Sequence, residues 1–290
     1  MSKYPGAKKR IGHLFGYLSM LGATVVTLLE YFYNDVIIWV WLLYGIVIVP
    51  LVAASAIIAV RAFFARRRTH FQRIVAVWGV LNLLLAAIVV NENQRTARAA
   101  RPDEMVAYYH RHADELRSLA AYARDAIDPG AWMYLEFERD EVIHFSVPGV
   151  GGAYGKEIDV AANCRSVGLS AEEFDEIRRR LKALHCISVD VSRPAEPVID
   201  PRGFQNPRTD PQRVTIGRVR WMMSKYDYGI FLQPVDDSLW NSLVSPSCCD
   251  ILPVNDSLVL VYGSPAFGSI CFPNREGWLE RWQIKKSQGD

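Results

Sequence analysis

Three long stretches near the N-terminus of this 290-residue chain contain no Lys, Arg, Asp or Glu. They run from Ile11 to Leu29, from Val36 to Val60 and from Ile74 to Asn91. A helix of about 20 apolar residues crosses the roughly 30 Å of hydrocarbon in a bilayer, whereas the core of a soluble domain seldom needs three such stretches in succession. The missing charge therefore predicts three transmembrane spans, at about residues 11–33, 36–60 and 74–91, with the lipid bilayer as their partner.

The predicted spans also lack polar machinery at membrane depth. Only Asn82 falls near the middle of a span, while His13 and Glu30 lie at span ends. Transport and proton relay use ionisable groups inside the bilayer, so we interpret this region as an anchor rather than as a subunit of a transporter. The first stretch is too long for the apolar part of a signal peptide, and no small-x-small cleavage site follows it before Glu30, which favours an uncleaved segment.

Charge is divided unevenly along the chain. Residues 1–100 carry eleven Lys and Arg against three Asp and Glu, a net charge of +8, whereas the remainder carries 22 against 28, a net charge of −6. The cations of the first part precede the first span or lie between the second and third: Lys3, Lys8, Lys9, Arg10, Arg61, Arg66, Arg67, Arg68 and Arg73. Positive residues favour the cytoplasmic side. We therefore expect residues 1–10 to be cytoplasmic, 92–101 to form a linker, and 102–290 to form an extracytoplasmic domain of a cell-membrane protein.

The acidic outer domain lacks the features of several binding classes. Without a basic stripe it is not expected to bind nucleic acid, because phosphate contacts supply most non-specific affinity. Paired CxxC spacing is absent, so no zinc site is expected. All the cysteines lie in this domain, which is typical of an oxidising compartment with one or two disulfides: Cys164, Cys186, Cys248, Cys249 and Cys271. Connectivity stays open, except that the adjacent Cys248 and Cys249 are expected to have separate partners.

Periodicity in the outer domain predicts an α+β fold on a mainly antiparallel sheet. A helix is expected from Pro102 to Ile127, and a second from Ser170, whose Ser-Ala-Glu-Glu sequence forms a capping box. Alternation predicts a β-hairpin at 132–137 and 142–147 and a half-buried strand at 186–192. Further antiparallel pairs are expected at 214–223 with 226–233, and at 257–262 with 269–272. The expected buried face of the first hairpin is Met133, Leu135, Phe137, Ile143, Phe145 and Val147.

A glycine-rich segment, PGVGGAYGK at residues 148–156, invites comparison with a phosphate-binding P-loop. The spacing fails, because Val150 stands where the first glycine is required and Glu157 replaces the Ser or Thr that holds magnesium. We expect a flexible loop that lines a ligand site. The candidate ligand-binding residues are Gly151, Gly152, Tyr154, Lys156, Tyr226 and Tyr228, although the two strand tyrosines also fit a core position.

Function is the least determined property of this sequence, which carries no recognisable family motif, metal site or cofactor motif. His144 is the one histidine with catalytic potential, because it projects from the face of its strand opposite the expected core. The leading hypothesis is a non-catalytic binding or interaction module of the cell envelope, with a protein partner or a second copy of the chain as its ligand. The alternative is an envelope hydrolase that uses His144 with a Cys or a carboxylate.

Overall fold

The computed structural model describes residues 94–290 except 139, 155–157, 194, 196–212, 222–223, 246–247, 264–270, 273 and 289–290, together with seven single residues before position 94. The chain divides into two compact units, Met1–Arg95 and Thr96–Asp290. Residues 1–10 and nearly all of the three expected spans lie outside the described residues. Among those that are described, no helix combines the length and apolarity needed to cross a bilayer. In the expected linker, residues 94–99 are helical.

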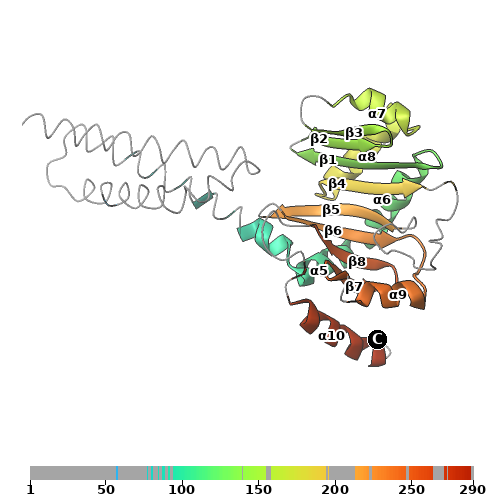
Figure 1. The fold of residues 1–290 in the computed structure, drawn as a ribbon. Helices are drawn as coiled ribbons and strands as arrows, with labels where there is room; N and C mark the ends of the chain where they lie inside the picture. Colours follow the sequence, from blue (N-terminus) through green and yellow to red (C-terminus); the bar gives the residue numbers. More distant parts are fainter. Residues whose placement is uncertain are drawn as a thin grey trace, which may run out of the picture. The chain divides into compact units, whose positions relative to one another are not determined.

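The second unit is built on an antiparallel sheet of eight strands, which confirms the expected α+β class (Figure 1). Its order is β3-β2-β1-β4-β5-β6-β8-β7, and every pair of neighbours runs antiparallel. The strands are β1 Ala131–Glu138, β2 Glu141–Val147, β3 Val150–Tyr154, β4 Ser188–Arg193, β5 Arg213–Trp221, β6 Ser224–Phe231, β7 Ile251–Asn255 and β8 Leu258–Tyr262. The first two expected hairpins and the half-buried strand are thereby confirmed.

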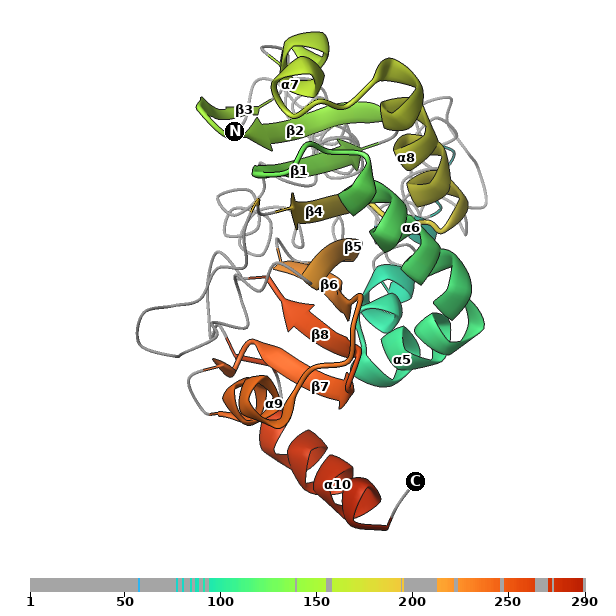
Figure 2. The same ribbon diagram turned by 90° about the vertical axis from the view of Figure 1, so that its right-hand side faces the viewer.

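Helices cover the sheet unequally (Figure 2). Their bounds are α5 Pro102–Arg111, α6 Ala113–Asp125, α7 Val160–Ser166, α8 Ala171–Ala183, α9 Asp237–Val244 and α10 Arg275–Gln288. Helix α6 packs on β4 and β5 with α8 beside it, α7 packs on β2, and α9 and α10 pack on β7. The expected capping box of α8 is present, because Ser170 Oγ accepts from the Glu173 amide at 3.2 Å and Glu173 Oε2 accepts from the Ser170 amide at 2.9 Å.

The two faces of the sheet bury different clusters, as the period of two along each strand requires. Leu258 and Leu260 of β8 join the main core under α5, α6, α7 and α8, whereas Val259 between them joins a second cluster with Leu239 and Leu243 of α9. Helix α9 therefore covers the opposite face at the β6-β8-β7 end. Along β1, β2, β4 and β5 that opposite face carries polar side chains, and we call it the polar face.

The single helix expected from residue 102 to 127 is wrong, because two helices occupy this stretch. His112 leaves helical geometry with φ −128° and ψ 26°, and α6 restarts with acidic residues in its first turn. His112 is half-buried at this break rather than a core residue, and its ring lies 4.4 Å from that of Tyr108. The expected apolar stripe is nevertheless buried on both helices, since Met105, Tyr109, Leu116, Leu119, Ala123 and Ile127 all join the main core.

The last expected strand pair is also wrong, because β8 lies between β6 and β7 and therefore has no open edge for another strand. Strand β7 was not predicted because it contains Pro253, which argues against a strand in the sheet interior. Proline is tolerated here because β7 is at the edge of the sheet, where no neighbouring strand needs an N–H donor on its outer side. The hairpin closes where Asn255 Oδ1 accepts from the Ser257 amide at 3.0 Å.

In the first hairpin Ile143 is half-buried instead of being a core residue. The ladder steps from Glu136 opposite His144 to Phe137 opposite Val142, so that Ile143 is the extra residue of a bulge. Phe145 and Val147, the other expected core residues of β2, are fully buried.

Candidate functional site

One polar row crosses the polar face because the strand registers are aligned. His144 of β2 is opposite Glu136 of β1, Glu136 is opposite Ser188 of β4, and the row continues through Gly217 of β5 to Asp227 of β6. Tyr134, Ser146 and Lys225 lie on the same face by strand alternation. Arg220 joins them because a register shift between Gly217 and Val219 puts it opposite Lys225. Residues from five strands, spread over more than 90 positions of the chain, are thus assembled into one site by the sheet.

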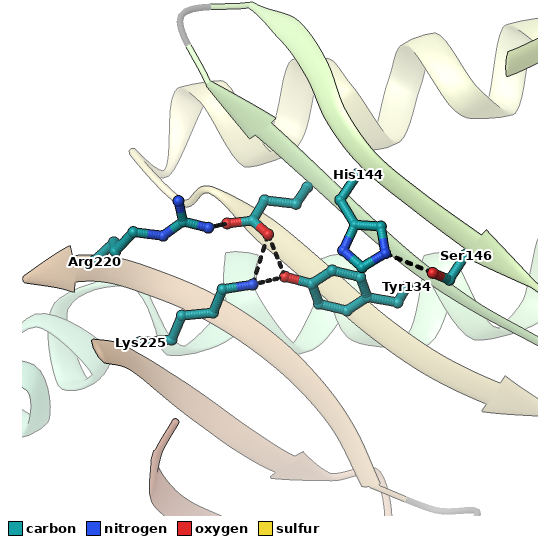
Figure 3. A network of polar contacts seen from close by, with 6 residues as sticks. Tyr134, His144, Ser146, Arg220 and Lys225 are labelled. Carbon is teal, nitrogen blue, oxygen red and sulfur yellow. Dashed lines mark hydrogen bonds and ion pairs between the residues drawn. The ribbon is translucent and has the colours of Figure 1, made fainter. Parts of the chain in front are cut away.

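Glu136 is the centre of this site, with 2 % of its surface exposed. Figure 3 shows Tyr134, Arg220 and Lys225 around the unlabelled carboxylate, with His144 and Ser146 beside them. Its carboxylate accepts from Tyr134 Oη at 2.6 Å and from Lys225 Nζ at 2.6 Å, and it forms an ion pair with Arg220. Lys225 also donates to Tyr134 Oη and lies 4.5 Å from the centre of that ring. Burying a carboxylate costs free energy unless the group is paired and hydrogen-bonded. Here Tyr134, Lys225 and Arg220 offset that cost, and their side chains are held in place around the carboxylate.

His144 lies beside this cluster and is itself held on two sides. The Tyr134 ring meets its imidazole at 4.8 Å between centres and 61° between planes. Its Nε2 shares a hydrogen bond of 2.6 Å with Ser146 Oγ. Partial burial, and then the charge of Arg220, lower the pKa of His144 below its usual range, so the ring is neutral near pH 7. A neutral imidazole hydrogen-bonded to a hydroxyl can act as a general base toward that hydroxyl.

Asp227 supplies the second carboxyl group of the polar row. Its Oδ1 is inaccessible to solvent and has no hydrogen-bond partner among the described residues. Burial raises the pKa of this carboxyl to about 7, Lys225 opposes the shift, and the charges of Glu136 and Asp190 add to it. The carboxyl is therefore protonated more easily than that of an ordinary aspartate, a property that is frequent at functional sites.

Two glycines let the side chains of this face pack closely. A Cβ on Gly217 would lie 2.0 Å from Ser188 Oγ and 3.3 Å from Asp227 Oδ1. A Cβ on Gly229 would lie 2.6 Å from a methyl of Val259 and 3.2 Å from Cδ of Arg213. The Ser188 side chain therefore packs directly against Gly217, and the aliphatic part of Arg213 packs against Gly229. Only a residue without a Cβ permits such a close approach.

The cysteines do not join the polar face as nucleophiles. Cys249 and Cys271 form a disulfide, while Cys164, Cys186 and Cys248 are free and buried. One disulfide is thus present where one or two were expected, and Cys249 has a partner away from its neighbour, whereas Cys248 is a free thiol and has no separate partner. Burial raises the pKa of Cys164 to about 11 and that of Cys186 to about 12, so neither forms a thiolate at neutral pH. No three His, Cys, Asp or Glu side chains within the described part of the chain converge as metal ligands do.

The expected ligand-binding residues have separate positions. Tyr226 and Tyr228 are buried in the main core, and Tyr228 Oη donates to the carbonyl of Met105 at 2.9 Å, so both have structural roles. Gly151, Gly152 and Tyr154 belong to β3 at the edge of the sheet, which corrects the expected flexible loop. Lys156 lies outside the described residues.

Of the site's members, sequence reasoning found only His144, and the whole network around Glu136 was missed: Tyr134, Glu136, Arg220 and Lys225. A signal was present, because Tyr134 and Glu136 alternate with core residues of β1, as His144 does on β2. Their convergence with Arg220 and Lys225 depends on β4 and β5 being inserted between β1 and β6, an order that strand periodicity does not determine. Comparison of the chain with protein-family models, with curated proteins and with solved structures returned no match.

Proposed function

We propose that this protein is a membrane-anchored binding or interaction module of the cell envelope, whose polar face contacts the partner. The observation that carries this proposal is the Glu136 network, which holds Tyr134, Arg220 and Lys225 in fixed positions on a face where, among the described helices, only α9 packs. Side chains fixed by a supporting network bind a partner at a smaller cost in conformational entropy than free ones. Trp132, 41 % exposed on the same face, adds an aromatic contact of the kind enriched in interfaces.

The first unit supports an anchor in the membrane. Val77, Val80, Leu84 and Ile88 are helical and between 53 % and 62 % exposed. Their spacing of three and four puts them on one side of a helix. Exposed apolar side chains of this kind are unfavourable in water and are covered when lipid surrounds them. Together with the arginine-rich loop between the second and third expected spans, these side chains support a bilayer location with the second unit outside the cytoplasm.

The location is tested with two engineered cysteines in the full-length protein. Glu172, exposed in the first turn of α8, is replaced by Cys in one variant, and Ser2 is replaced by Cys in the other. A membrane-impermeant maleimide applied to intact cells should label the first variant, whereas the second should react only after lysis. Labelling of the Glu172→Cys variant only after lysis would overturn the orientation.

The binding role is tested by cross-linking from the polar face. A photoreactive amino acid replaces Trp132 in one variant and Glu172, on the helix-covered side, in the matched control. We expect a discrete cross-linked product from the first position only, and its yield should fall in a Glu136→Gln background because the network no longer fixes its neighbours. A monodisperse single copy in detergent, with no product from either position, would contradict the proposal.

An envelope hydrolase remains the alternative, and fewer residues can now act as the partner of His144. The protonated, buried thiols of Cys164 and Cys186 speak against a cysteine partner for His144. A hydrolase in which His144 acts with a carboxylate is still consistent with the structure, because Glu136 is directly opposite His144 in the β1-β2 ladder. Loss of hydrolytic activity in Glu136→Gln with unchanged cross-linking from position 132 would favour this alternative over the binding role.

A further inference from the structure

We propose that Ser146 and His144 form a nucleophile and base pair that accepts the acyl group of a carboxylic ester, with the glycine bulge of β3 beside the reacting carbonyl. This inference goes beyond the proposed binding role and does not depend on it. Three separate features of the polar face meet at this point: a hydroxyl bonded to an imidazole, a network that orients the imidazole, and an irregular glycine pair opposite the hydroxyl.

The first feature is the geometry of the pair. Ser146 and His144 are two residues apart on β2, so both side chains project from the polar face. The distance between Ser146 Oγ and His144 Nε2 is 2.6 Å, within the range of a nucleophile bonded to its base. Both residues are half-buried, so neither is enclosed in the main core. With its proton on Nδ1, the neutral imidazole accepts the Ser146 proton at Nε2.

The second feature is the fixed orientation of the imidazole. Its ring contacts the Tyr134 ring at 4.8 Å, and Tyr134 donates through its hydroxyl to the buried Glu136. Lys225 binds both Tyr134 and Glu136. Tyr134 is thus a positioning residue, which holds His144 from the side while the Glu136 network holds Tyr134. Orientation of the base contributes to rate because proton transfer requires the acceptor in line with the hydroxyl.

The third feature is a bulge opposite Ser146. In the β2-β3 ladder Phe145 pairs with Ala153 and Val147 pairs with Val150, so Gly151 and Gly152 together oppose the single residue Ser146. A bulge leaves one residue outside the regular ladder, and such bulges occur beside active sites. Glycine lets a ligand approach the main chain closely, so amides of this bulge are suited to donate to the oxygen of a tetrahedral intermediate.

The proposed step is balanced within the pair and an ester. Ser146 Oγ forms a bond to the carbonyl carbon as its proton moves to His144 Nε2, and the carbonyl oxygen carries the negative charge. The bond to the alkoxy oxygen then breaks, and the alcohol leaves with the proton from His144. Water attacks the acyl-serine by the same sequence, so that Ser146 is restored and a carboxylic acid is released.

The test uses the full-length protein in detergent and a fluorophosphonate probe, which modifies serines that have an assisting base. We expect covalent labelling that peptide mass spectrometry locates at Ser146, and none in Ser146→Ala. The control is Ser192→Ala, a half-buried serine on the same face, which should label as the unaltered chain does. Labelling of His144→Ala should be at least about 100-fold slower. No labelling at Ser146 in a chain that unfolds with its normal melting temperature would overturn the proposal.

A pH series and a conservative variant separate catalysis from structure. The labelling rate of the unaltered chain should fall as pH drops below the usual His range, because protonated His144 cannot accept the Ser146 proton. Tyr134→Phe keeps the ring contact and should retain most of the rate, whereas Tyr134→Leu should lower the rate about tenfold without moving the pH profile. A rate that ignores both His144 and pH would show that Ser146 reacts without a base, contrary to the proposal.

Discussion

Glu136 offers the sharpest test of how the polar face is held together. Replacement by alanine removes a carboxylate with 3 % of its side chain exposed, and Arg220, Lys225 and the Tyr134 hydroxyl each lose this acceptor. Breaking a buried ion pair from one side costs about 3–5 kcal/mol, because the remaining charge is uncompensated. Arg220 and Lys225 keep side-chain exposures of 27 % and 25 %, so water replaces part of the loss. We therefore expect a destabilisation near the lower limit, about 3 kcal/mol.

The measurement is thermal unfolding of the full-length protein in detergent, followed by tryptophan fluorescence. For a unit of this size about 3 kcal/mol corresponds to a fall in melting temperature on the order of 10 °C. Glu136→Gln, which retains an acceptor oxygen and loses the charge, should fall by about half as much. Glu138→Ala is the matched control, because Glu138 is on the same strand and exposed, and it should change the melting temperature by about 1 °C or less.

A triple replacement distinguishes charge burial from loss of packing. If uncompensated charge causes the loss, replacing Glu136, Arg220 and Lys225 together by Met should restore much of the stability lost in Glu136→Ala, since no charge is then left without a partner. A Glu136→Ala variant as stable as Glu138→Ala would refute the reasoning. A triple variant less stable than Glu136→Ala would show that packing, not electrostatics, sets the contribution of this residue.

Three further predictions concern neighbouring features. Because burial raises the pKa of Asp227 from 3.8 to about 7, the folded chain loses stability as pH rises through that interval. Asp227→Asn should therefore be the more stable chain at pH 8 by a few kcal/mol, at about 1.4 kcal/mol per pKa unit, with the difference closing near pH 4 in urea titrations; a difference independent of pH would contradict this. Replacing both Cys249 and Cys271 by Ser should lower the free energy of unfolding by about 3 kcal/mol, since a loop of 22 residues is opened, and added reductant should not destabilise this variant further. Gly217→Ala should lower stability by about 1–3 kcal/mol through its clash with Ser188 Oγ, and adding Ser188→Ala should recover most of the loss in a melting assay; no recovery would exclude that contact as the cause.

Local pattern predicted the elements whose signals lie within one segment. The Ser170 capping box, the first hairpin and the stripe from Met105 to Ile127 are of this kind, because cap chemistry and period reflect neighbours two to four residues apart. The failures have equally local causes. The single helix failed at His112, where the chain restarts without a glycine or proline to mark the break. Strand β7 was missed because it contains Pro253, a residue that a strand accommodates only at the edge of a sheet.

The candidate site was predicted only at His144, whose position on the face opposite the core follows from strand alternation. The hydrogen bond to Ser146 was within reach of the same argument, because both residues are on one strand at a spacing of two. The convergence of Tyr134 and Glu136 with Arg220 and Lys225 was not, since the ion pairs and the hydrogen bond that join them connect positions 84 to 91 residues apart. The cysteines could be counted but not paired, and Cys249 with Cys271 is one of many connectivities that the count permits.

By itself the sequence determined the division of the chain into a basic apolar part and an acidic α+β part, because composition and periodicity are properties of a segment and need no knowledge of its neighbours. The tertiary structure decided what the second part presents on its surface. Strand order and register set His144, Glu136, Ser188, Gly217 and Asp227 in one row, and a shift of a single residue in any strand would have turned its member of that row into the core. The polar face exists because long-range pairing fixed those registers, and no local pattern contains that information.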